Sequence, residues 1–420
     1  MENGKNYEVK DLGLASQGRK NIELAEMRMG PVMEIRKRFE KEKPLKGITV
    51  GMALHVTKET AVLVRTLIVG GAKVAITSCN PLSTQDDAAA ALAEEGVNVY
   101  AYKGESREDY YKYLEKVLSH QPNIMIDDGL DLITEVHTKR REMLPEIIGG
   151  CEETTTGIIR VRAMEREGVL KFPVIAVNDN KTKHLLDNYY GTGQSTLDGI
   201  MRATNILFAG KSVVVAGYGD CGKGVALKAK GLGANIIVTE VDAFRALQAK
   251  LDGYRVMPIQ EAVKEGDIFI TVTGNKHVIT AEHVKRMKDG AVLANAGHFD
   301  VEVDVEGIKK VAKSARRVRP FMDEYIIEGK KVYVLGEGRL INLVAAEGHP
   351  SEVMATSFAG QALAVEYLVK NKGKLPAKVL ALPEKIDNEI AELQLKALGV
   401  EKDKLTVEQK KYLASWKEGT

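Results

Sequence analysis

From Lys46 onward, short β-branched hydrophobic runs alternate with longer stretches in which apolar residues recur at helical spacing. Runs of the first kind predict strands, and stretches of the second kind predict helices. Strands joined by crossover helices run parallel, so the alternation predicts a doubly wound α/β sheet. In the first part of the chain it places strands at 48–54, 73–77, 97–100 and 124–126, and helices at 59–69, 86–95 and 108–118.

A second unit of the same kind begins near Lys211, with strands predicted at 212–216, 235–239, 268–271 and 291–293. Between the units, residues 182–208 predict helices with a break at Tyr190-Gly191-Thr192-Gly193. Helices here, rather than a Pro- or Ser-rich tether, indicate a hinge between domains. The charged stretch 386–416 carries leucines at helical spacing, and such an appendage either packs on a partner subunit or covers its own domain. The expected fold class is α/β, with two doubly wound (Rossmann-like) parallel-sheet domains plus a small helical C-terminal segment.

The charge balance of the 420 residues excludes some classes of function. With 60 Lys and Arg against 58 Asp and Glu, the chain lacks the concentrated basic field of a nucleic-acid or membrane-surface protein. Cys79, Cys151 and Cys221 form no CxxC pair, so they indicate neither a disulfide framework nor a zinc site. Met1 to Lys20 is polar, and no run of about 18 apolar residues exists that could span a bilayer. We expect a soluble, cytoplasmic protein that binds no nucleic acid, no membrane and no metal.

A glycine-rich turn follows the strand predicted at 212–216. Gly217, Gly219 and Gly222 form a G-x-G-x-x-G pattern, which permits a tight turn, a close approach of the backbone to a pyrophosphate, and close packing of the next helix. Glu240 lies 18 residues after Gly222 (240 − 222) at the end of the next strand, where it can accept from both ribose hydroxyls of NAD. Arg245 could accept a 2′-phosphate, but Glu240 would repel that phosphate. We therefore expect NAD rather than NADP.

Polar residues also gather where the strands of the first unit end. His55, Asn80 and Asp128 each follow a predicted strand, and doubly wound sheets bind ligands beyond the carboxyl ends of their strands. Further specific motifs are E-E-T-T-T-G at 152–157, G-Y-G-D-x-G-K-G at 217–224 and G-H-F-D-V-E at 297–302. In order and spacing, from about Val9 to Tyr412, the motifs resemble the S-adenosylhomocysteine hydrolase (adenosylhomocysteinase) family, in a short form without an inserted segment in the first domain.

This resemblance implies an enzyme of the methyl cycle that reversibly hydrolyses S-adenosyl-L-homocysteine to adenosine and L-homocysteine, with one tightly bound NAD per subunit. Oxidation of the 3′-hydroxyl to a ketone acidifies the C4′ proton, so homocysteine leaves by elimination; water then adds and the hydride returns to the sugar. The resemblance also implies a substrate-binding domain at 1–185 and 350–382, an NAD-binding domain at 186–349, a C-terminal segment at 383–420, and a homotetramer.

The resemblance assigns residues to each task. Lys183 and Asp187 grip the ribose hydroxyls, and Lys183 is the 3′ base with a pKa lowered by desolvation. Asp128 takes the C4′ proton, and His55 serves elimination and water addition at C5′. The remaining catalytic residues are Glu153 and Asn178, which orient Lys183 and the sugar, and the substrate contacts add Thr57, Glu59, His298 and His349. The cofactor contacts are Thr154, Thr155, Thr156, Asn188, Gly217, Gly219, Asp220, Cys221, Gly222, Lys223, Gly224, Glu240, Arg245, Ala296, Gly297, His298 and Asn342.

Some residues affect the choice of nucleobase, and others differ from the family pattern. The Glu59 carboxylate can accept from the N6 amino group of adenine, whereas O6 of hypoxanthine would face it acceptor to acceptor; this favours adenosine over inosine unless a water bridges. Glu347 stands where many members carry an apolar methionine near the base, and this leaves the selectivity open. Thr192 replaces a cysteine, and Arg245 replaces an asparagine. The tail that reaches a neighbouring subunit's NAD in many members is missing, so NAD retention is also open.

Two other functions compete with this one. An NAD-dependent 2-hydroxyacid dehydrogenase shares the two-domain plan, but it would leave E-E-T-T-T-G and the Lys183–Asp187 pair without a role. A catalytically silent, nucleotide-binding homologue would be expected to have lost the residues that grip the ribose, and these residues are present.

Overall fold

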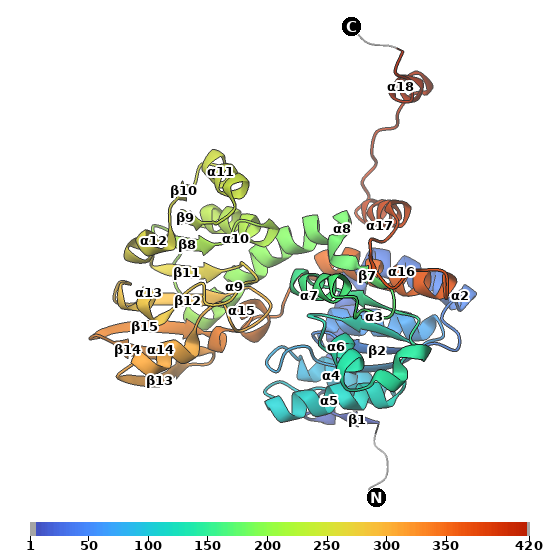
Figure 1. Cartoon of the computed structure of the whole chain (residues 1–420), viewed down its shortest axis with the longest axis horizontal. Coiled ribbons are helices and arrows are strands. Elements are labelled where there is room, and N and C mark those ends of the chain that lie inside the picture. The colour runs from blue at the N-terminus through green and yellow to red at the C-terminus, as the bar shows by residue number, and fades with distance from the viewer. Residues whose placement is uncertain (1–5, 418–420) are drawn as a thin grey trace, which may run out of the picture.

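The computed structural model describes residues 6–417 and contains two eight-stranded sheets side by side, each flanked by helices (Figure 1). The first five residues of the predicted substrate-binding domain and the last three of the predicted C-terminal segment lie outside the described residues. The two α/β units predicted from the hydrophobic pattern are therefore confirmed.

The first sheet is parallel throughout, in the order β1-β4-β3-β2-β5-β6-β7-β16. Its last strand, β16, comes from the far end of the chain and pairs with β7. The strands are β1 (Tyr7–Glu8), β2 (Thr49–Ala53), β3 (Lys73–Thr77), β4 (Asn98–Tyr100), β5 (Ile124–Asp127), β6 (Gly149–Glu152), β7 (Val174–Ala176) and β16 (Val379–Leu380). The helices around it are α1 (Ala15–Arg28), α2 (Gly30–Glu42), α3 (Lys58–Val69), α4 (Asp86–Glu94), α5 (Arg107–Ser119), α6 (Asp131–Thr138), α7 (Thr155–Arg166), α16 (Ser351–Lys370) and α17 (Glu384–Ala397).

The second sheet has the order β10-β9-β8-β11-β12-β15-β14-β13. Its strands are β8 (Ser212–Ala216), β9 (Asn235–Thr239), β10 (Arg255–Val256), β11 (Ile268–Thr271), β12 (Ala291–Asn295), β13 (Ser314–Arg319), β14 (Met322–Ile327) and β15 (Lys330–Leu335). Its helices are α10 (Asp220–Gly231), α11 (Ala243–Leu251), α12 (Ile259–Glu265), α13 (Ala281–Lys285), α14 (Val305–Val311) and α15 (Ile341–Val344).

One edge of the second sheet differs from the prediction of parallel strands. β14 runs antiparallel to both β13 and β15. Glu328 and Gly329 join β14 to β15, and both have positive φ, as a two-residue hairpin turn requires. The pattern of crossover helices does not reveal this hairpin, because the strands follow one another without a helix between them.

Helices bury both faces of each sheet, and the side chains of a strand divide between the two cores. In β5, Ile124 and Ile126 belong to one hydrophobic cluster and Met125 to another. In β8, Val213 and Val215 likewise face one cluster and Val214 the other. This alternation follows from the two-residue period of a strand, and it explains why strands buried on both faces appear as continuous apolar runs.

The chain between the two units is continuously helical. α8 (Lys181–Lys183) leads into a π-helix (His184–Gly191), and α9 (Thr192–Thr204) follows directly. The predicted break at 190–193 is therefore wrong. The glycines there allow close packing instead, since a Cβ on Gly193 would lie 2.6 Å from the carbonyl oxygen of Gly224 in α10.

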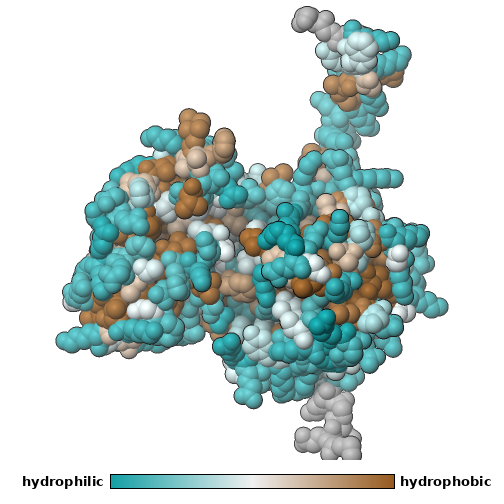
Figure 2. All heavy atoms as spheres, viewed as in Figure 1, coloured by the Kyte–Doolittle hydropathy of each residue, from teal (hydrophilic) through white to brown (hydrophobic). Residues whose placement is uncertain are grey.

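The C-terminal segment is helical only in part. α17 packs on α16 and α2, residues 398–406 are not helical, and α18 (Val407–Leu413) stands away from the body of the molecule (Figure 1). Hydrophobic side chains are exposed on α18, as Figure 2 shows. This helix does not cover its own domain. Within residues 6–417, no helix is long and apolar enough to cross a membrane.

Candidate active site between the two sheets

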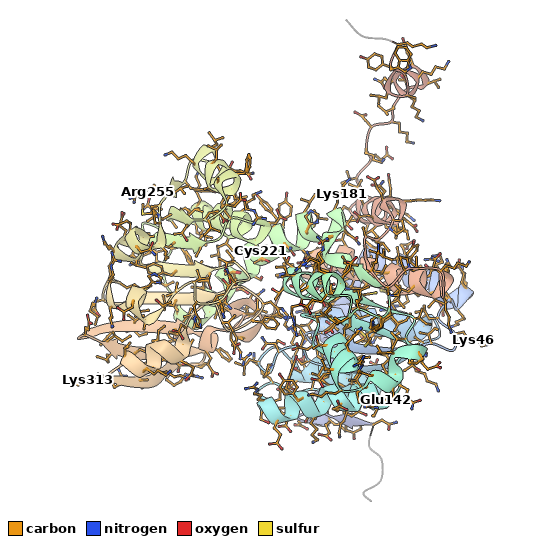
Figure 3. The ribbon with its side chains drawn as sticks, in the orientation of Figure 1. Lys46, Glu142, Lys181, Cys221, Arg255 and Lys313 are labelled. Carbon is orange, nitrogen blue, oxygen red and sulfur yellow. The ribbon has the colours of Figure 1, made fainter. Side chains whose placement is uncertain are left out.

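A cavity of about 1130 Å³ lies where the carboxyl ends of both sheets face each other. Cys221, at the start of α10, marks its position between the two halves of the molecule (Figure 3). The predicted site residues that line it are His55, Thr57, Glu59, Asp128, Glu153, Thr154, Thr155, Thr156, Lys183, Asp187, Asn188, Gly217, Gly219, Asp220, Cys221, Glu240, Arg245, Ala296, Gly297, His298, Asn342 and His349. A cavity of this size accommodates a dinucleotide together with a smaller ligand.

Four predicted residues do not line the cavity. Asn178 is buried behind it, where its Oδ1 accepts from Thr155 Oγ1 and Asn188 Nδ2, each at 3.3 Å. Gly222, Lys223 and Gly224 lie within the first turns of α10, and the two glycines pack against neighbouring backbone. Among residues 6–417, Asn178 therefore reaches Lys183 only through Asn188.

His55 lies between β2 and α3, next to Thr57, which caps α3 by accepting from the backbone N–H of Thr60. The imidazole Nδ1 is 2.7 Å from Ser83 Oγ, and Nε2 is 3.4 Å from Asp128 Oδ2. Burial lowers the pKa of His55 to about 4, against the opposing effect of Asp128. His55 is therefore neutral at physiological pH, which suits a group that accepts or relays a proton.

Asp128 follows β5 and lies between two histidines. His298 Nδ1 is 3.5 Å from Asp128 Oδ1, and the His298 and His55 rings are neighbours, with centroids 6.0 Å apart. These three side chains each offer one ligand atom within 4.8 Å of the others, so their geometry could also hold a metal ion. Because His298 belongs to the second unit, Asp128 connects the two halves of the cavity.

The turn that carries Asp128 is held by buried carboxylates. Glu152 Oε1 accepts from the backbone N–H groups of Gly129 and Thr154, at 2.8 and 3.0 Å. Asp127 accepts from the N–H groups of Asp128 and Ile133. These bonds tie the turn after β5 to the turn after β6, which carries Glu153.

Lys183 is almost fully buried and lies among several acceptors. Its Nζ is 2.8 Å from Asn188 Oδ1, 3.0 Å from Asp187 Oδ1 and 3.8 Å from Glu153 Oε1. In a π-helix, the residue at position i+5 lies nearly above residue i along the helix axis. The π-helix after Lys183 therefore brings the side chains of Asp187 (i+4) and Asn188 (i+5) to the same ammonium group. Such segments occur frequently at functional sites.

The charges in this cluster set one another's proton affinities. Burial alone would lower the pKa of Lys183, but the carboxylates of Asp187 and Glu153 outweigh it and raise that pKa above its ordinary value. The prediction that desolvation lowers the pKa of Lys183 is therefore wrong for the protein chain without its cofactor. Burial raises the pKa of Glu153 to about 7, although Lys183 opposes it. Glu153 also accepts from Ser357 and Gln361 of α16.

His349 borders the same cluster from the second unit. Its Nε2 is 3.5 Å from Asp187 Oδ1, and its Nδ1 is 2.9 Å from Ser195 Oγ. Asn342 donates to the same Ser195 hydroxyl at 3.2 Å. Both residues line the cavity, so the structure brings them together with the Lys183 cluster.

The glycine turn after β8 has the geometry that a dinucleotide site requires. Gly217 has a φ of 107°, and a Cβ on Gly219 would meet only the guanidinium of Arg245, at 3.6 Å. The loop is thus open to a diphosphate at the N-terminus of α10. Glu240 accepts from the backbone N–H groups of Tyr218, Val241 and Asp242, which orients its carboxylate at the cavity. The residues present therefore fit NAD.

Sequence reasoning missed several residues of the site. Thr273, Gly274 and Asn275 follow β11 and line the cavity, and the buried Glu302 holds this turn by accepting from two of their N–H groups. Their position just after the strand predicted at 268–271 could have indicated them, because ligands bind at the carboxyl ends of such strands. Ser351, Ser357 and Gln361 of α16 were also missed, although a polar residue on a nearly apolar helix indicates a buried partner.

Comparison with known proteins identifies the family. The family model "S-adenosyl-L-homocysteine hydrolase" matches residues 6–146, and the model of that family's NAD binding domain matches residues 188–348. The protein belongs to the S-adenosyl-L-homocysteine hydrolase family. The predictions of an enzyme from this family and of NAD as its cofactor are confirmed.

Relatives with two different names are similar over nearly the whole chain. The S-inosyl-L-homocysteine hydrolase of Methanocaldococcus jannaschii is 60% identical over 99% of this chain and 100% of its own. The adenosylhomocysteinase of Saccharolobus solfataricus is also 60% identical, with the same coverage. That of Aquifex aeolicus is 56% identical, again over 99% of this chain and 100% of its own.

Proposed function

We propose that this enzyme reversibly hydrolyses S-adenosyl-L-homocysteine to adenosine and L-homocysteine within the methyl cycle. The proposal depends chiefly on one observation: the buried Lys183–Asp187 pair, Asp128 and the glycine turn after β8 line a single cavity. A hydride acceptor, a ribose-binding pair and a base for a carbon acid are the parts that the oxidation–elimination scheme requires. A 2-hydroxyacid dehydrogenase would give the Lys183 cluster no task.

The first step concerns the 3′-hydroxyl of the ribose. Asp187 accepts from the ribose hydroxyls, and Lys183 takes the 3′-hydroxyl proton after passing its own proton to Glu153. With a pKa of about 7, the Glu153 carboxyl group can hold a proton near neutral pH, but the raised pKa of Lys183 opposes the transfer in the chain alone. The positive charge of bound NAD would lower the pKa of Lys183 and so favour the transfer. NAD, when bound, supplies the oxidation at C3′ and the reduction that closes the cycle.

The next steps take place at C4′ and C5′. With a ketone at C3′, Asp128 takes the C4′ proton, and the C5′–S bond breaks to release homocysteine. Asp128 passes this proton to the neutral His55, 3.4 Å away, and His55 relays it to the leaving sulfur. When water adds at C5′, His55 takes a proton from the water and returns it through Asp128 to C4′. His298 contacts the other carboxylate oxygen of Asp128, and Asn178 keeps Asn188 in place against Lys183.

The cofactor contacts come from both units. We propose that Gly217, Gly219 and Asp220 bind the diphosphate, Glu240 the adenosine ribose, and Thr154–Thr156 with Asn342 the nicotinamide half. Arg245 is exposed at the mouth of the cavity, where it can lie over the adenine. We also propose an intracellular homotetramer with domains at 1–185 with 350–382, 186–349 and 383–420.

The test is the nucleotide that the purified protein carries. Because the hydride returns to the same sugar, the protein should retain NAD(H) without added cofactor. Acid release followed by chromatography should yield NAD(H), and adenosine added to the holoenzyme should raise the absorbance of NADH. Finding only NADP(H), or no reduction by adenosine, would overturn the proposal.

A further inference from the structure

The hydroxyl group of Ser195 lies behind the cavity, between one predicted cofactor contact and one predicted substrate contact. Ser195 belongs to α9, is 2% exposed and does not line the cavity. Its Oγ is 2.9 Å from His349 Nδ1 and 3.2 Å from Asn342 Nδ2. Both of these partners line the cavity, so one buried hydroxyl contacts two residues of its wall.

The atoms around His349 decide which of its ring nitrogens carries the proton. Its Nε2 is 3.5 Å from Asp187 Oδ1, and an ionised carboxylate only accepts hydrogen bonds. Burial would raise the pKa of Asp187, but Lys183 and His349 outweigh it and lower that pKa, so the carboxylate is ionised. Thr192 Oγ1 is also 3.5 Å from Nε2, and because its hydroxyl donates to Cys221 Sγ, it too faces Nε2 as an acceptor. Nε2 therefore carries the proton, and Nδ1 of the neutral ring is an acceptor.

This assignment sets the direction of the remaining hydrogen bonds. Ser195 donates its only hydroxyl proton to His349 Nδ1, so its oxygen accepts from Asn342 Nδ2. A second acceptor, the carbonyl oxygen of Gly191 at 2.8 Å, is available to the hydroxyl when the ring gains another proton. The Asn342 amide is thus held with its Oδ1 turned away from Ser195, and this atom is buried without a partner among residues 6–417. The hydrogen bonds run in one direction, from Asn342 through Ser195 and His349 to Asp187.

We propose, on the basis of the function above, that Ser195 is a positioning residue that couples cofactor and substrate binding through this chain of hydrogen bonds. On the cofactor side it presents Asn342 Oδ1 to a donor group, which the carboxamide of the nicotinamide ring supplies when NAD is bound. On the substrate side it keeps the Nε2–H group of His349 on Asp187, and this fixes the carboxylate that accepts from the ribose hydroxyls. Hydride transfer requires the sugar and the nicotinamide in one geometry, and a single hydroxyl orients the contacts of both.

Paired ligands test the two ends of the chain separately. At the substrate end, adenosine is compared with 2′,3′-dideoxyadenosine, which lacks the hydroxyls that Asp187 accepts from. The enzyme is loaded with NADH for this comparison, so that adenosine binds without being oxidised. At the cofactor end, NAD is compared with 3-acetylpyridine adenine dinucleotide, whose ketone offers no donor to Asn342, by rebinding to enzyme stripped of its nucleotide. Isothermal titration calorimetry gives the four dissociation constants.

Ser195→Ala should lower the preference for adenosine over the dideoxynucleoside, and the preference for NAD over its analogue, by about tenfold each, because His349 and Asn342 lose the partner that orients them. Ser195→Cys keeps the shape of the side chain with a weaker hydrogen-bonding group. It should give intermediate preferences, and it serves if the alanine variant folds poorly. Thr196→Val is the matched control on α9, since Thr196 is fully buried and its Oγ1 has no hydrogen-bond partner among the described residues. It should keep both preferences.

The inference is overturned if folded Ser195→Ala and Ser195→Cys keep the wild-type preference at either end of the chain. This holds even where all four ligands bind more weakly, because a packing defect would weaken both members of a pair equally. Wild type that binds NAD and its analogue equally well would overturn it too. Wild type without a preference for adenosine over the dideoxynucleoside would instead overturn the proposed function, since the Lys183–Asp187 pair would then not bind the ribose.

Discussion

At the residue scale, the ionisable groups that line the cavity form two sets: a charged cluster around Lys183 and a neutral imidazole at His55. Around Lys183 the opposite charges of Asp187 and Glu153 compensate for burial, so a charged cluster is kept out of water. Around His55 burial outweighs the attraction of Asp128, so the imidazole stays neutral. The first set suits chemistry on hydroxyls, and the second suits proton transfer at carbon and sulfur.

This division predicts that Lys183→Ala and Asp128→Asn stop turnover at different stages. Lys183→Ala removes the base for the 3′-hydroxyl, so adenosine should no longer reduce the bound NAD. Asp128→Asn should still allow reduction but should stop exchange of the C4′ proton with solvent. Single-turnover absorbance at the NADH band and deuterium incorporation separate the two. Lys181→Ala, which alters a surface lysine paired with Glu384, is the control that should retain both signals. Identical defects in both variants would contradict the division.

The low pKa of His55 also predicts a dependence of stability on pH. The folded-state pKa of about 4 lies below the ordinary 6.5, so unfolding takes up a proton as the pH falls through this interval. The stabilisation is complete above pH 6.5 and is lost toward pH 4. Between pH 7 and pH 5 the group should contribute about 2 kcal/mol to the loss of unfolding free energy. His55→Asn should lose correspondingly less in denaturant unfolding at the two pH values; equal losses would show that His55 titrates normally.

The sequence predicted the site residues at the strand ends, but it did not predict the neighbours that shift their pKa values. His55 and Asp128 follow predicted strands, and parallel strands bring such ends together whatever the details of packing. The pKa of Lys183 could not be predicted in the same way, because it depends on burial and on the carboxylate of Glu153, which is 30 residues away in sequence (183 − 153).

At the element scale, the fold depends on close contacts between the linking helices and α10. Strands such as β3, β8, β9 and β11 have the bounds that the hydrophobic pattern predicts. The helical connection was predicted with a break because glycine is a poor helix former. Glycine is present there because α9 and α10 approach so closely that the backbone of Gly224 occupies the place of a side chain on Gly193. Propensity cannot reveal such a contact.

This contact predicts that Gly193→Ala loosens the NAD site. The added methyl group would push α9 from the first turns of α10, and overpacking of this kind costs about 1–3 kcal/mol. We expect a lower melting temperature and weaker NAD rebinding to the stripped enzyme. Gly231→Ala is the matched control in α10, because a Cβ there meets nothing within 4 Å. It should keep wild-type affinity for NAD, and a Gly193→Ala variant with the same affinity would show that the helices can separate freely.

At the scale of the whole molecule, function requires both units at once. Asp128 meets His298, Asp187 meets His349, and Lys58 meets Glu347, each pair joining residues that are more than 150 positions apart. Separation of the units would divide the cavity, so chemistry depends on their approach. A closed cavity also excludes water while the oxidised sugar is present.

The last prediction concerns α18, which has no contact surface on its own subunit. Residues 398–417 are exposed, with Trp416 89% exposed and Leu413 68% exposed, and Figure 2 shows hydrophobic side chains there. Apolar side chains on a projecting helix indicate a protein interface, and a symmetric oligomer is the usual partner. α17 is different, because Asp387 accepts from the backbone N–H groups of Lys181 and Thr182 and so anchors α17 to its own subunit.

Deletion of residues 401–420 should therefore spare the fold of the subunit and reduce the size of the assembly. Light scattering coupled to size exclusion should show a homotetramer for the full chain and a smaller particle for the deletion, with the far-UV circular dichroism of the remaining helices retained. Lys411→Ala is the control on α18, since it changes a charged side chain without removing Leu413 or Trp416, and it should keep the full size. A deletion variant with the mass of the intact assembly would place the subunit contacts elsewhere and leave α18 without a role in assembly.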